Sequence, residues 1–402
     1  MTAGGDVPAV LLGGATNALS VARGLGAIGV HVYALGEGGA PVQHSRYCRE
    51  FTAIRDSSPQ TAMFEWLVQC APSGAVVIPC EDDGLELILR RRGELAAAGL
   101  RPARANDVVG IDLLDKERTY EIARASGVGA PRTVTIRGEE DIARALDEVD
   151  MPCALKPLHI HEFAKHFRRK VILVRSESDL RRAVARTSAL GLEMLVTEII
   201  QGPEDQYWSY YTYVAGDGTP LVDFTKQKIR QYPVGFGGAT YHVTRWNPLV
   251  AAAGKRFVNG SGVRGVACVE FKLDPRDGEP KIMECNARVT AANELMRSAG
   301  IDLGVMAYQD AAGLPLTRYG GFREGVRLWY PLQDCLAFRH MRRNRQISTS
   351  QWLMSLAHRQ RFPVFSLDDP APALHGLRTF PKRAFRLVAR SSDQSSDPSA
   401  EF

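Results

Sequence analysis

The chain has 402 residues, 45% hydrophobic and 24% charged, which is the composition of an ordinary globular protein long enough for two to three domains. Its net charge of +5 is small, and no block of Lys and Arg alternates with aromatic residues, so nucleic acid is not an expected partner. No run of 18 apolar residues occurs, so a membrane is not an expected partner either.

The cysteines and the N-terminus bear on the cellular compartment. Seven cysteines are scattered singly, without the paired spacing of a zinc site, and such thiols are typical of a cytoplasmic protein. No positively charged segment precedes the first apolar run, so a signal peptide is not expected. We therefore predict a cytoplasmic location.

Residues 1–105 have the pattern of an open α/β domain with a parallel sheet. The apolar spacing predicts strands at 7–12, 30–35 and 76–79 and helices at 18–28 and 85–100. Since ligands bind at the carboxyl ends of parallel strands, Thr16, Asn17 and Asp82 are candidates for substrate contact. The alternative, which the sequence leaves open, is a tight turn followed by a helix cap.

Two further units and a C-terminal region follow. In residues 106–195, strands are predicted at 132–136, 154–157, 171–174 and 194–199, and helices at 115–125, 139–148 and 178–189. In residues 196–318, strands are predicted at 207–214, 220–225, 241–244, 265–273 and 280–285, and helices at 248–261 and 301–312. Residues 319–390 are rich in arginine with helical spacing, and the Ser- and Asp-rich residues 391–402 predict a disordered tail.

Acidic residues interrupt two apolar strands that a short turn joins. Glu270 lies on the first strand, and Glu284 and Asn286 lie on the second with a spacing that points both to one face. Hairpin pairing would bring Glu270 near Glu284 or Asn286. Two carboxylates and an amide oxygen suit magnesium that bridges phosphates. Because unpaired buried charge is costly, acids among apolar residues favour such a site over a surface hairpin with ordinary charges.

These acids and the order of elements around them resemble the ATP-grasp enzymes, in which a Glu on one strand precedes Glu-x-Asn-x-Arg on the next. The resemblance covers residues 7–315 and rests on Asp115-Lys116, Ala154-Leu155-Lys156-Pro157, Val196-Thr197-Glu198-Ile199-Ile200-Gln201-Gly202, Glu270-Phe271-Lys272 and Met283-Glu284-Cys285-Asn286-Ala287-Arg288. It implies a mixed α/β and α+β chain with the ATP-grasp fold. An N-terminal open parallel-sheet domain would precede two ATP-grasp lobes, at 106–195 and 196–318, and a small helical C-terminal region.

The resemblance also implies ATP as cofactor, together with Mg²⁺, for which Mn²⁺ could substitute. Lys116 and Lys156 would contact the ATP phosphates. Many ATP-grasp enzymes cover the phosphates with a glycine-rich loop, whereas residues 158–170 here contain no glycine and are rich in His, Lys and Arg. A basic flap of this kind could still attract phosphate.

The linker between the two lobes would bind the nucleoside. By the resemblance, Glu198 and Ile200 would lie against the adenine. Glu204 or Asp205 would offer a carboxylate to the ribose hydroxyls, and Glu204 is the preferred candidate of the two. A solvent-exposed turn is the alternative for this acidic pair.

A basic strand end at 225–233 runs into a glycine-rich loop at 235–238. It resembles the loop that leads toward the acyl phosphate in the branch of carboxylate–amine ligases that includes D-aspartate ligase-like proteins. Lys228 and Arg230 would share one strand face and could meet a phosphate or a substrate carboxylate. The loop would be a lid that closes on substrate, with a flexible surface loop as the alternative.

The reaction implied by the resemblance joins a small-molecule carboxylate to an amine through an acyl phosphate, with release of ADP and phosphate. Arg288 would steady the acyl phosphate. The sequence does not identify either substrate, and dimers are common among such enzymes, so a homodimer is one expected state. Two alternatives remain open: an ATP-grasp enzyme with another acceptor, such as a kinase or a thioester-forming ligase, and a non-catalytic nucleotide-binding protein.

Overall fold

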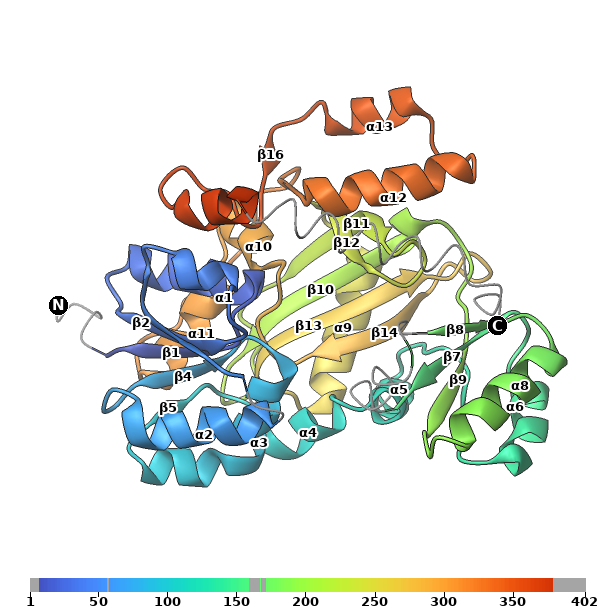
Figure 1. The fold of residues 1–402 in the computed structure, drawn as a ribbon, viewed down its shortest axis with the longest axis horizontal. Coiled ribbons are helices and arrows are strands. Elements are labelled where there is room, and N and C mark those ends of the chain that lie inside the picture. Colours follow the sequence, from blue (N-terminus) through green and yellow to red (C-terminus); the bar gives the residue numbers. More distant parts are fainter. Residues whose placement is uncertain (1–6, 56–57, 159–166, 168–170, 379–402) are drawn as a thin grey trace.

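The structure is a computed structural model that describes residues 7–55, 58–158, 167 and 171–378. The expected tail at 391–402 and most of the expected basic flap, residues 159–166 and 168–170, lie outside the described residues. Within the described ranges, helices flank three sheets of five, seven and four strands (Figure 1). No helix in those ranges is long and apolar enough to cross a membrane.

The N-terminal domain is an open parallel sheet with the strand order β3-β2-β1-β4-β5, as the sequence predicts. Its strands are β1 (Ala9–Leu12), β2 (Val32–Gly36), β3 (Cys48–Ala53), β4 (Val76–Pro79) and β5 (Arg101–Pro102). Helix α1 (Thr16–Ala27) packs on one face, and α2 (Pro59–Cys70) and α3 (Asp82–Ala97) pack on the other. Because both faces are covered, every residue of β1 and β4 is buried.

Helices α4 (Asp107–Asp112) and α5 (Lys116–Ala125) lead into a four-stranded antiparallel sheet. Its strands, in the order β6-β9-β7-β8, are β6 (Thr133–Ile136), β9 (Met194–Glu198), β7 (Cys153–Pro157) and β8 (Ile172–Val174). Helices α6 (Ile142–Glu148) and α8 (Glu177–Ser188) cover one face. Since strand residues alternate between faces, Leu155 enters this core and Lys156 points away from it.

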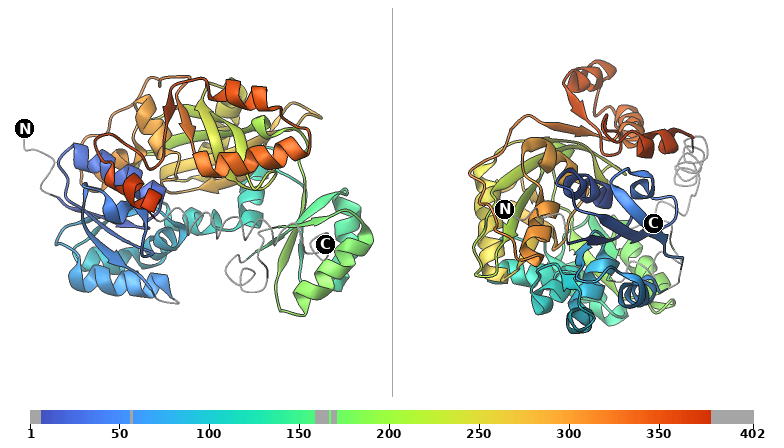
Figure 2. Two further views of the ribbon diagram at one scale, coloured as in Figure 1. Left: turned by 45° about the horizontal axis from the view of Figure 1, so that its top comes forward. Right: turned by 90° about the vertical axis from the view of Figure 1, so that its left-hand side faces the viewer.

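The large sheet has the strand order β14-β13-β10-β11-β12-β15-β16. Its strands are β10 (Tyr207–Val214), β11 (Phe224–Tyr232), β12 (Gly238–Thr244), β13 (Gly265–Leu273), β14 (Pro280–Asn286), β15 (Arg327–Trp329) and β16 (Gln360–Arg361). Helix α9 (Pro248–Ser261) packs on one face, against Tyr210 and Phe271. On the other face, Tyr211 and Phe224 pack against α1, α10 (Asn293–Ala299) and α11 (Leu303–Ala311). Figure 2 shows the four-stranded sheet with α6 and α8 standing to one side of the large sheet.

The second strand of the predicted hairpin starts later than expected. Instead of spanning 220–225, β11 begins at Phe224 and continues to Tyr232. Pro220 has no N–H to donate to a ladder, and it makes only an isolated bridge with Val214.

The C-terminal region is helical in part only. Helices α12 (Pro331–Arg343) and α13 (Thr349–Leu356) lie where helical spacing predicts them. The same region also supplies β15 and β16, which lengthen the large sheet beyond β12. The region therefore contains the expected helices and also extends the large sheet by two short strands.

Candidate active site

Glu270 and Glu284 face each other across the hairpin of β13 and β14. The register pairs Glu270 with Glu284 and Cys268 with Asn286. On β14, the Asn286 Nδ2 donates a hydrogen bond to the Glu284 Oε1 over 3.1 Å. The register thus brings the two acids together, as predicted, and their role as metal ligands stays a prediction.

Lysines from three elements surround this acid pair. The Lys228 Nζ on β11 lies 2.9 Å from the Glu270 Oε1, and both side chains are largely buried. Lys116 opens α5, where the capping carboxylate of Asp115 fixes the first helical turn. Lys156 approaches from the end of β7 in the four-stranded sheet. Helix α5, the four-stranded sheet and the large sheet therefore each contribute a cation.

The charges of these groups shift one another's pKa values. Burial opposes the ionised form of Glu284, but the positive charges of Lys116 and Lys228 hold its pKa below the usual range. Burial together with the charge of Lys116 lowers the pKa of Lys156 to about 8, although Glu284 acts in the opposite direction. Cations that crowd together in this way favour a polyanionic ligand such as a triphosphate.

The donor set fits a magnesium ion that a nucleotide helps to hold. Among the described residues, no group of three or more His, Cys, Asp and Glu side chains could hold a metal ion by itself. Glu270, Glu284 and the amide oxygen of Asn286 offer oxygen ligands on one strand face. Magnesium is commonly bound by one or two carboxylates plus substrate phosphates, so an incomplete protein shell of this kind matches it.

The aromatic ring of Tyr207 lies close to two lysines, Lys228 and Lys272. The sequence analysis assigned no role to Lys272. The Nζ atoms of Lys228 and Lys272 lie 4.5 Å and 4.7 Å from the centre of that ring. Glu204 lies nearby and accepts a hydrogen bond from the backbone N–H of Gly235 over 3.1 Å. Its carboxylate therefore ties the glycine-rich loop to the chain beside the expected ribose site, whereas Asp205 is exposed.

Glu198, expected against the adenine, uses its side chain for contacts between the two lobes. Its carboxylate lies 2.7 Å from the Arg276 Nη1 and 3.4 Å from the Arg132 Nη2. Burial raises its pKa, but hydrogen bonds from Arg132 and Arg276 bring the net value below the usual range. Ile200 is buried nearby. Any contact that this linker makes with adenine therefore falls to Ile200 and to backbone groups.

Arg230 does not share a strand face with Lys228, contrary to the expectation from two-residue spacing. The pairing of β11 with β12 shifts register on both sides of Arg230, so that Lys228 pairs with His242 and Arg230 pairs with the adjacent Tyr241. A β-bulge of this kind reverses the side-chain alternation. Arg230 forms a buried ion pair with Asp334 on α12 instead, with N–O distances of 2.8 and 2.9 Å.

Arg288 joins the acid pair to the N-terminal domain. Its guanidinium donates to both carboxylate oxygens of Asp82, over 2.6 and 3.0 Å, and Asp82 is exposed. The other two candidates from this domain have local partners: the Asn17 side chain donates to the Cys80 carbonyl, and Thr16 is hydrogen-bonded to Tyr330. The side-chain helix cap that the sequence left open is not formed, because the N-cap residue of α1 is Ala15 and no side chain of the described residues caps the helix.

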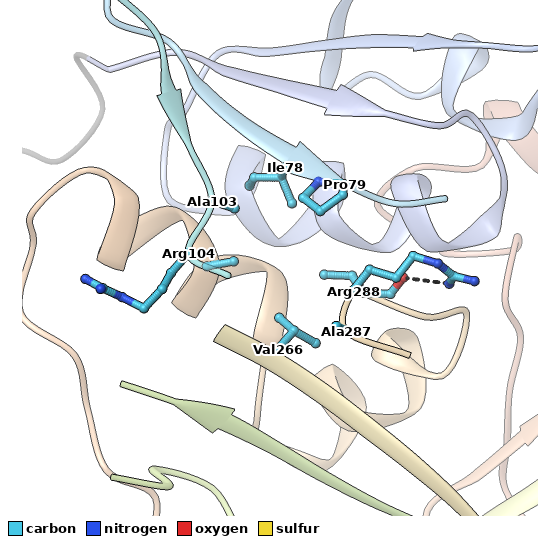
Figure 3. A pocket seen from close by; sticks show the side chains of 9 residues that line it. Ile78, Pro79, Ala103, Arg104, Val266, Ala287 and Arg288 are labelled. Carbon is cyan, nitrogen blue, oxygen red and sulfur yellow. Dashed lines mark hydrogen bonds between the residues drawn. The ribbon is translucent and has the colours of Figure 1, made fainter. Parts of the chain in front are cut away.

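A small pocket lies beside Arg288, between β4 and β13 (Figure 3). It is lined by Ile78, Pro79, Ala103, Arg104, Val266, Ala287, Arg288, Val289 and Ala307. Arg104 and Arg288 point away from it at opposite ends. Neither Glu270 nor Glu284 lines this pocket, so it belongs to the domain interface and not to the acid pair.

Comparison with solved structures defines the class of fold. The biotin carboxylase domain of the Hydrogenobacter thermophilus 2-oxoglutarate carboxylase, solved with MgADP, superposes with a TM-score of 0.63 at 16% identity, over 79% of this chain and 73% of that one. An ADP complex of N5-carboxyaminoimidazole ribonucleotide synthetase gives 0.60 at 16% identity, over 79% and 81%. The chain therefore has the ATP-grasp fold, as its sequence predicts.

Relatives in sequence and structure include ligases. A D-aspartate ligase from Enterococcus faecium (strain Aus0004) is 24% identical over 295 residues, which cover 67% of each chain. The L-amino acid ligase from Bacillus licheniformis superposes with a TM-score of 0.59 at 16% identity, over 80% of this chain and 78% of that one. A scan against protein families gives no match. The resemblance to the carboxylate–amine ligase branch of the ATP-grasp enzymes is confirmed by these relatives.

The sequence analysis assigned no role to Lys226 and Lys272, two buried lysines of the large sheet. The alternation of strand residues nevertheless places both on the faces that carry the predicted site residues. Lys272 stands two residues after Glu270, and Lys226 stands two residues before Lys228. Both are therefore on the strand faces that carry the predicted site residues. Their burial, with 6% and 4% of the residue exposed, distinguishes them from surface lysines, and burial was not evident from sequence.

Proposed function

We propose that the protein is an ATP-dependent ligase that joins a carboxylate to an amine through an acyl phosphate. The observation that carries the proposal is the Glu270–Glu284 pair, which Lys116, Lys156 and Lys228 surround from three separate elements. Two acids ringed by cations fit a Mg-triphosphate better than they fit a neutral ligand. The relatives in sequence and structure support the same class of reaction.

The chain would bind ATP through both lobes. Lys116 and Lys156 would hold the phosphates, and Ile200 with neighbouring backbone groups would pack on the adenine. A carboxylate oxygen of Glu204 or Asp205 would accept hydrogen bonds from the ribose hydroxyls. Glu270, Glu284 and Asn286 would hold Mg²⁺ or Mn²⁺, which when bound would neutralise charge on the phosphate oxygens.

The reaction has two steps. An oxygen of the substrate carboxylate attacks the γ-phosphorus, the bond to the β-phosphate oxygen breaks, and ADP leaves. The neutral amine then attacks the carbonyl carbon of the acyl phosphate and loses a proton, and phosphate leaves. Lys228 would orient the oxygens that receive the phosphoryl group, because it is fixed by Glu270 at the edge of the acid pair.

Arg288 would stabilise the acyl phosphate by exchanging partners. In the described structure it is held by Asp82, whose side chain is 61% exposed. Because the Asp82 side chain reaches solvent, water could solvate its carboxylate after a phosphoryl group had taken its place on Arg288. Arg230 is left out of the proposal, because Asp334 occupies its guanidinium in the core.

The proposal is tested by ADP release in the presence of MgATP, with amino acids supplied singly and in pairs. Because a relative is a D-aspartate ligase, D-aspartate is the first carboxylate to pair with each amine. ADP that forms only with a particular pair, with an amide detected by mass spectrometry, is the expected result. ADP with one carboxylate alone and no amide would point to a kinase instead.

The remaining parts of the proposal concern the whole chain. We keep the domain limits expected from the sequence, with an N-terminal domain at 1–105, lobes at 106–195 and 196–318, and a C-terminal region at 319–390. We also keep a cytoplasmic location, small-molecule substrates and a homodimer as the state to test first. Light scattering of the purified chain measures the last of these.

A further inference from the structure

Asp82 connects the N-terminal domain to Arg288, two residues beyond the end of β14. It opens α3 just after the carboxyl end of β4, and ligands bind at this edge of a parallel sheet. Its carboxylate accepts two hydrogen bonds from Arg288, one from Nε over 2.6 Å and one from Nη2 over 3.0 Å. The Asp82 side chain is 61% exposed and that of Arg288 is 15% exposed. Asp82 is therefore open to solvent while it holds a largely buried cation.

The two acids beside Asp82 in the turn 81–83 have other surroundings. Burial raises the pKa of Glu81, and two backbone N–H groups of the turn after β1 and the charge of Arg288 oppose that rise. The Glu81 carboxylate thus lies against the turn after β1. Asp83 lies beside α2, where the Gln60 Nε2 donates to its Oδ1 over 3.4 Å. Of these three acids, Asp82 is the one that is hydrogen-bonded to Arg288.

Arg288 also lies within electrostatic reach of the acid pair. Burial opposes its charged form, but the hydrogen bonds and the charge of Asp82, and then the charge of Glu284, raise the pKa of Arg288. A guanidinium binds a carboxylate or a phosphoryl group through two parallel hydrogen bonds from one edge. Asp82 occupies the edge formed by Nε and Nη2, and Nη1 donates to the Val289 carbonyl over 3.5 Å. A phosphoryl group that binds Arg288 in this way therefore displaces the Asp82 carboxylate.

Displacement leaves the Asp82 carboxylate beside a second anion. In the proposed reaction, Arg288 turns to the acyl phosphate, so that no cation remains between its phosphoryl group and Asp82. Facing anions attract a cation into the space between them. The protonated form of the amine substrate is such a cation, and it would reach Asp82 from solvent. The exchange therefore prepares a place for the amine only after the carboxylate has been activated.

We propose that Asp82 binds the amine substrate and accepts a proton from it as the amine attacks the acyl phosphate. The inference rests on the proposed ligase function and adds a base to its second step. The ammonium first loses one proton to water. The nitrogen then forms the C–N bond, the bond from the carbonyl carbon to the phosphate oxygen breaks, and phosphate leaves with the bonding electrons. The second N–H proton passes to the Asp82 carboxylate and on to water, because this side chain is exposed.

The test compares two kinds of nucleophile in reactions with MgATP and D-aspartate, or with another amino acid of the ADP-release test in its place. Hydroxylamine is uncharged at neutral pH and traps acyl phosphates as hydroxamates without the help of a base. The same amino acids, supplied one at a time as the amine, are charged and have to lose protons. The hydroxamate is measured by the colour of its iron complex, and the amide is measured by mass spectrometry.

Asp82→Asn should lower amide formation about a hundredfold or more, the scale of a lost general base. Its hydroxamate formation should stay within about threefold of the wild type, because the first step does not use the charge of Asp82. Asp82→Glu keeps a carboxylate and should regain most of the lost amide formation. Asp83→Asn is the matched control, since it removes the same charge from the next residue of the turn, and it should form both products at the wild-type rate.

A residue that only positions Arg288 would give a different pattern. Asp82→Asn would then lose hydroxamate and amide formation in equal proportion, because Arg288 acts on the acyl phosphate that both products share. That result, or full amide formation by Asp82→Asn, overturns the inference and leaves the ligase function standing. A wild-type protein that forms no hydroxamate with any of the carboxylates would contradict the ligase function itself, and the inference with it.

Discussion

At the scale of single residues, the positive charges around Glu284 define the proposed metal site. Lys116, Lys228 and Arg288 all act to keep this carboxylate ionised. An ionised acid that faces a second acid is suited to a divalent cation and would be poorly placed without one.

Replacing that charge should stop turnover without harming the fold. Glu284→Gln should lower magnesium-dependent ADP release about a hundred- to a thousandfold, the scale of losing one group that stabilises transferring charge. Glutamine has the same size and its side-chain oxygen can still accept the hydrogen bond from Asn286, so the melting temperature of the variant should stay near that of the wild type. Glu279→Gln, on the exposed turn of the same hairpin, is the control and should turn over normally. Full activity of Glu284→Gln would remove the metal assignment.

Lys156 predicts a pH dependence of ATP binding. Its pKa is lowered to about 8 in the nucleotide-free chain, and a bound triphosphate would raise it. Below that pH the lysine is charged in both states and affinity is at its full value. Above it, binding takes up a proton, so affinity falls by up to about tenfold per pH unit until the pKa of the complex is reached.

Calorimetry of MgATP binding between pH 7 and pH 10 measures this effect. Lys156→Met should bind about ten- to a hundredfold more weakly near pH 7 and should show a flatter pH profile. A wild-type affinity that does not change with pH would exclude Lys156 from the phosphate site.

The sequence identified the acid pair because strand alternation and apolar flanks are local signals. It did not identify Lys226 or Lys272, because their burial depends on strands far away in the chain. It also placed Arg230 in the site, since a bulge leaves no trace in a two-residue pattern.

At the scale of elements, Asp334 fastens the C-terminal helices to the large sheet. Its buried carboxylate accepts hydrogen bonds from Arg230 on β11, Thr240 on β12, Trp329 on β15 and Trp352 on α13. One acidic side chain at the start of α12 therefore connects three strands and a second helix.

Asp334→Asn should destabilise the protein by about 3–5 kcal/mol, because it leaves Arg230 buried without its charge partner. Urea unfolding followed by circular dichroism measures the change. Glu193→Gln breaks an exposed pair with Arg137 and should cost no more than about 1 kcal/mol. An equal, small effect of both substitutions would contradict the role given to Asp334.

Helices and strands with a clear periodic pattern of apolar residues were predicted from the sequence, and those without such a pattern were not. Helix α9 was predicted over 248–261, the range that it occupies, because apolar residues recur at helical spacing. The edge strand β3 and the strands β15 and β16 went unrecognised. β3 is largely exposed at the sheet edge, and β15 and β16 are three and two residues long, so none of them carries a clear periodic signal.

At the scale of the whole molecule, the described C-terminal segment returns to the N-terminal domain (Figure 1). Asp369 accepts hydrogen bonds from the Arg23 Nε over 2.9 Å and from the Ser45 Oγ over 2.7 Å, and it is fully buried. The segment therefore closes over α1, more than 300 residues away in the sequence.

Asp369→Ala should release this segment. Arg23 would then be buried without its partner, which costs about 3–5 kcal/mol if the domain stays closed. Brief trypsin digestion followed by mass spectrometry should show faster cleavage after Arg359 and Arg361 than in the wild type. Leu367→Ala, which alters a neighbouring residue that is 88% exposed, should be cleaved at the wild-type rate. Equal cleavage of all three proteins would argue against the closure.

The order of the units along the chain was evident from the sequence, but their contacts were not. The ion pair of Glu198 with Arg276 links the four-stranded sheet to the turn between β13 and β14, and no local pattern predicts it. Contacts between units depend on how separately folded surfaces meet, and that information is spread over the whole chain.

In the proposed reaction, an oxygen of the substrate carboxylate ends in the released phosphate, because the two are joined in an acyl phosphate. The most direct measurement supplies a substrate carboxylate labelled with ¹⁸O, together with MgATP and the amine, and analyses the released phosphate by mass spectrometry. The account predicts one ¹⁸O atom in each phosphate formed with the amide, and no such phosphate from Glu284→Gln. Amide formation with unlabelled phosphate would contradict it.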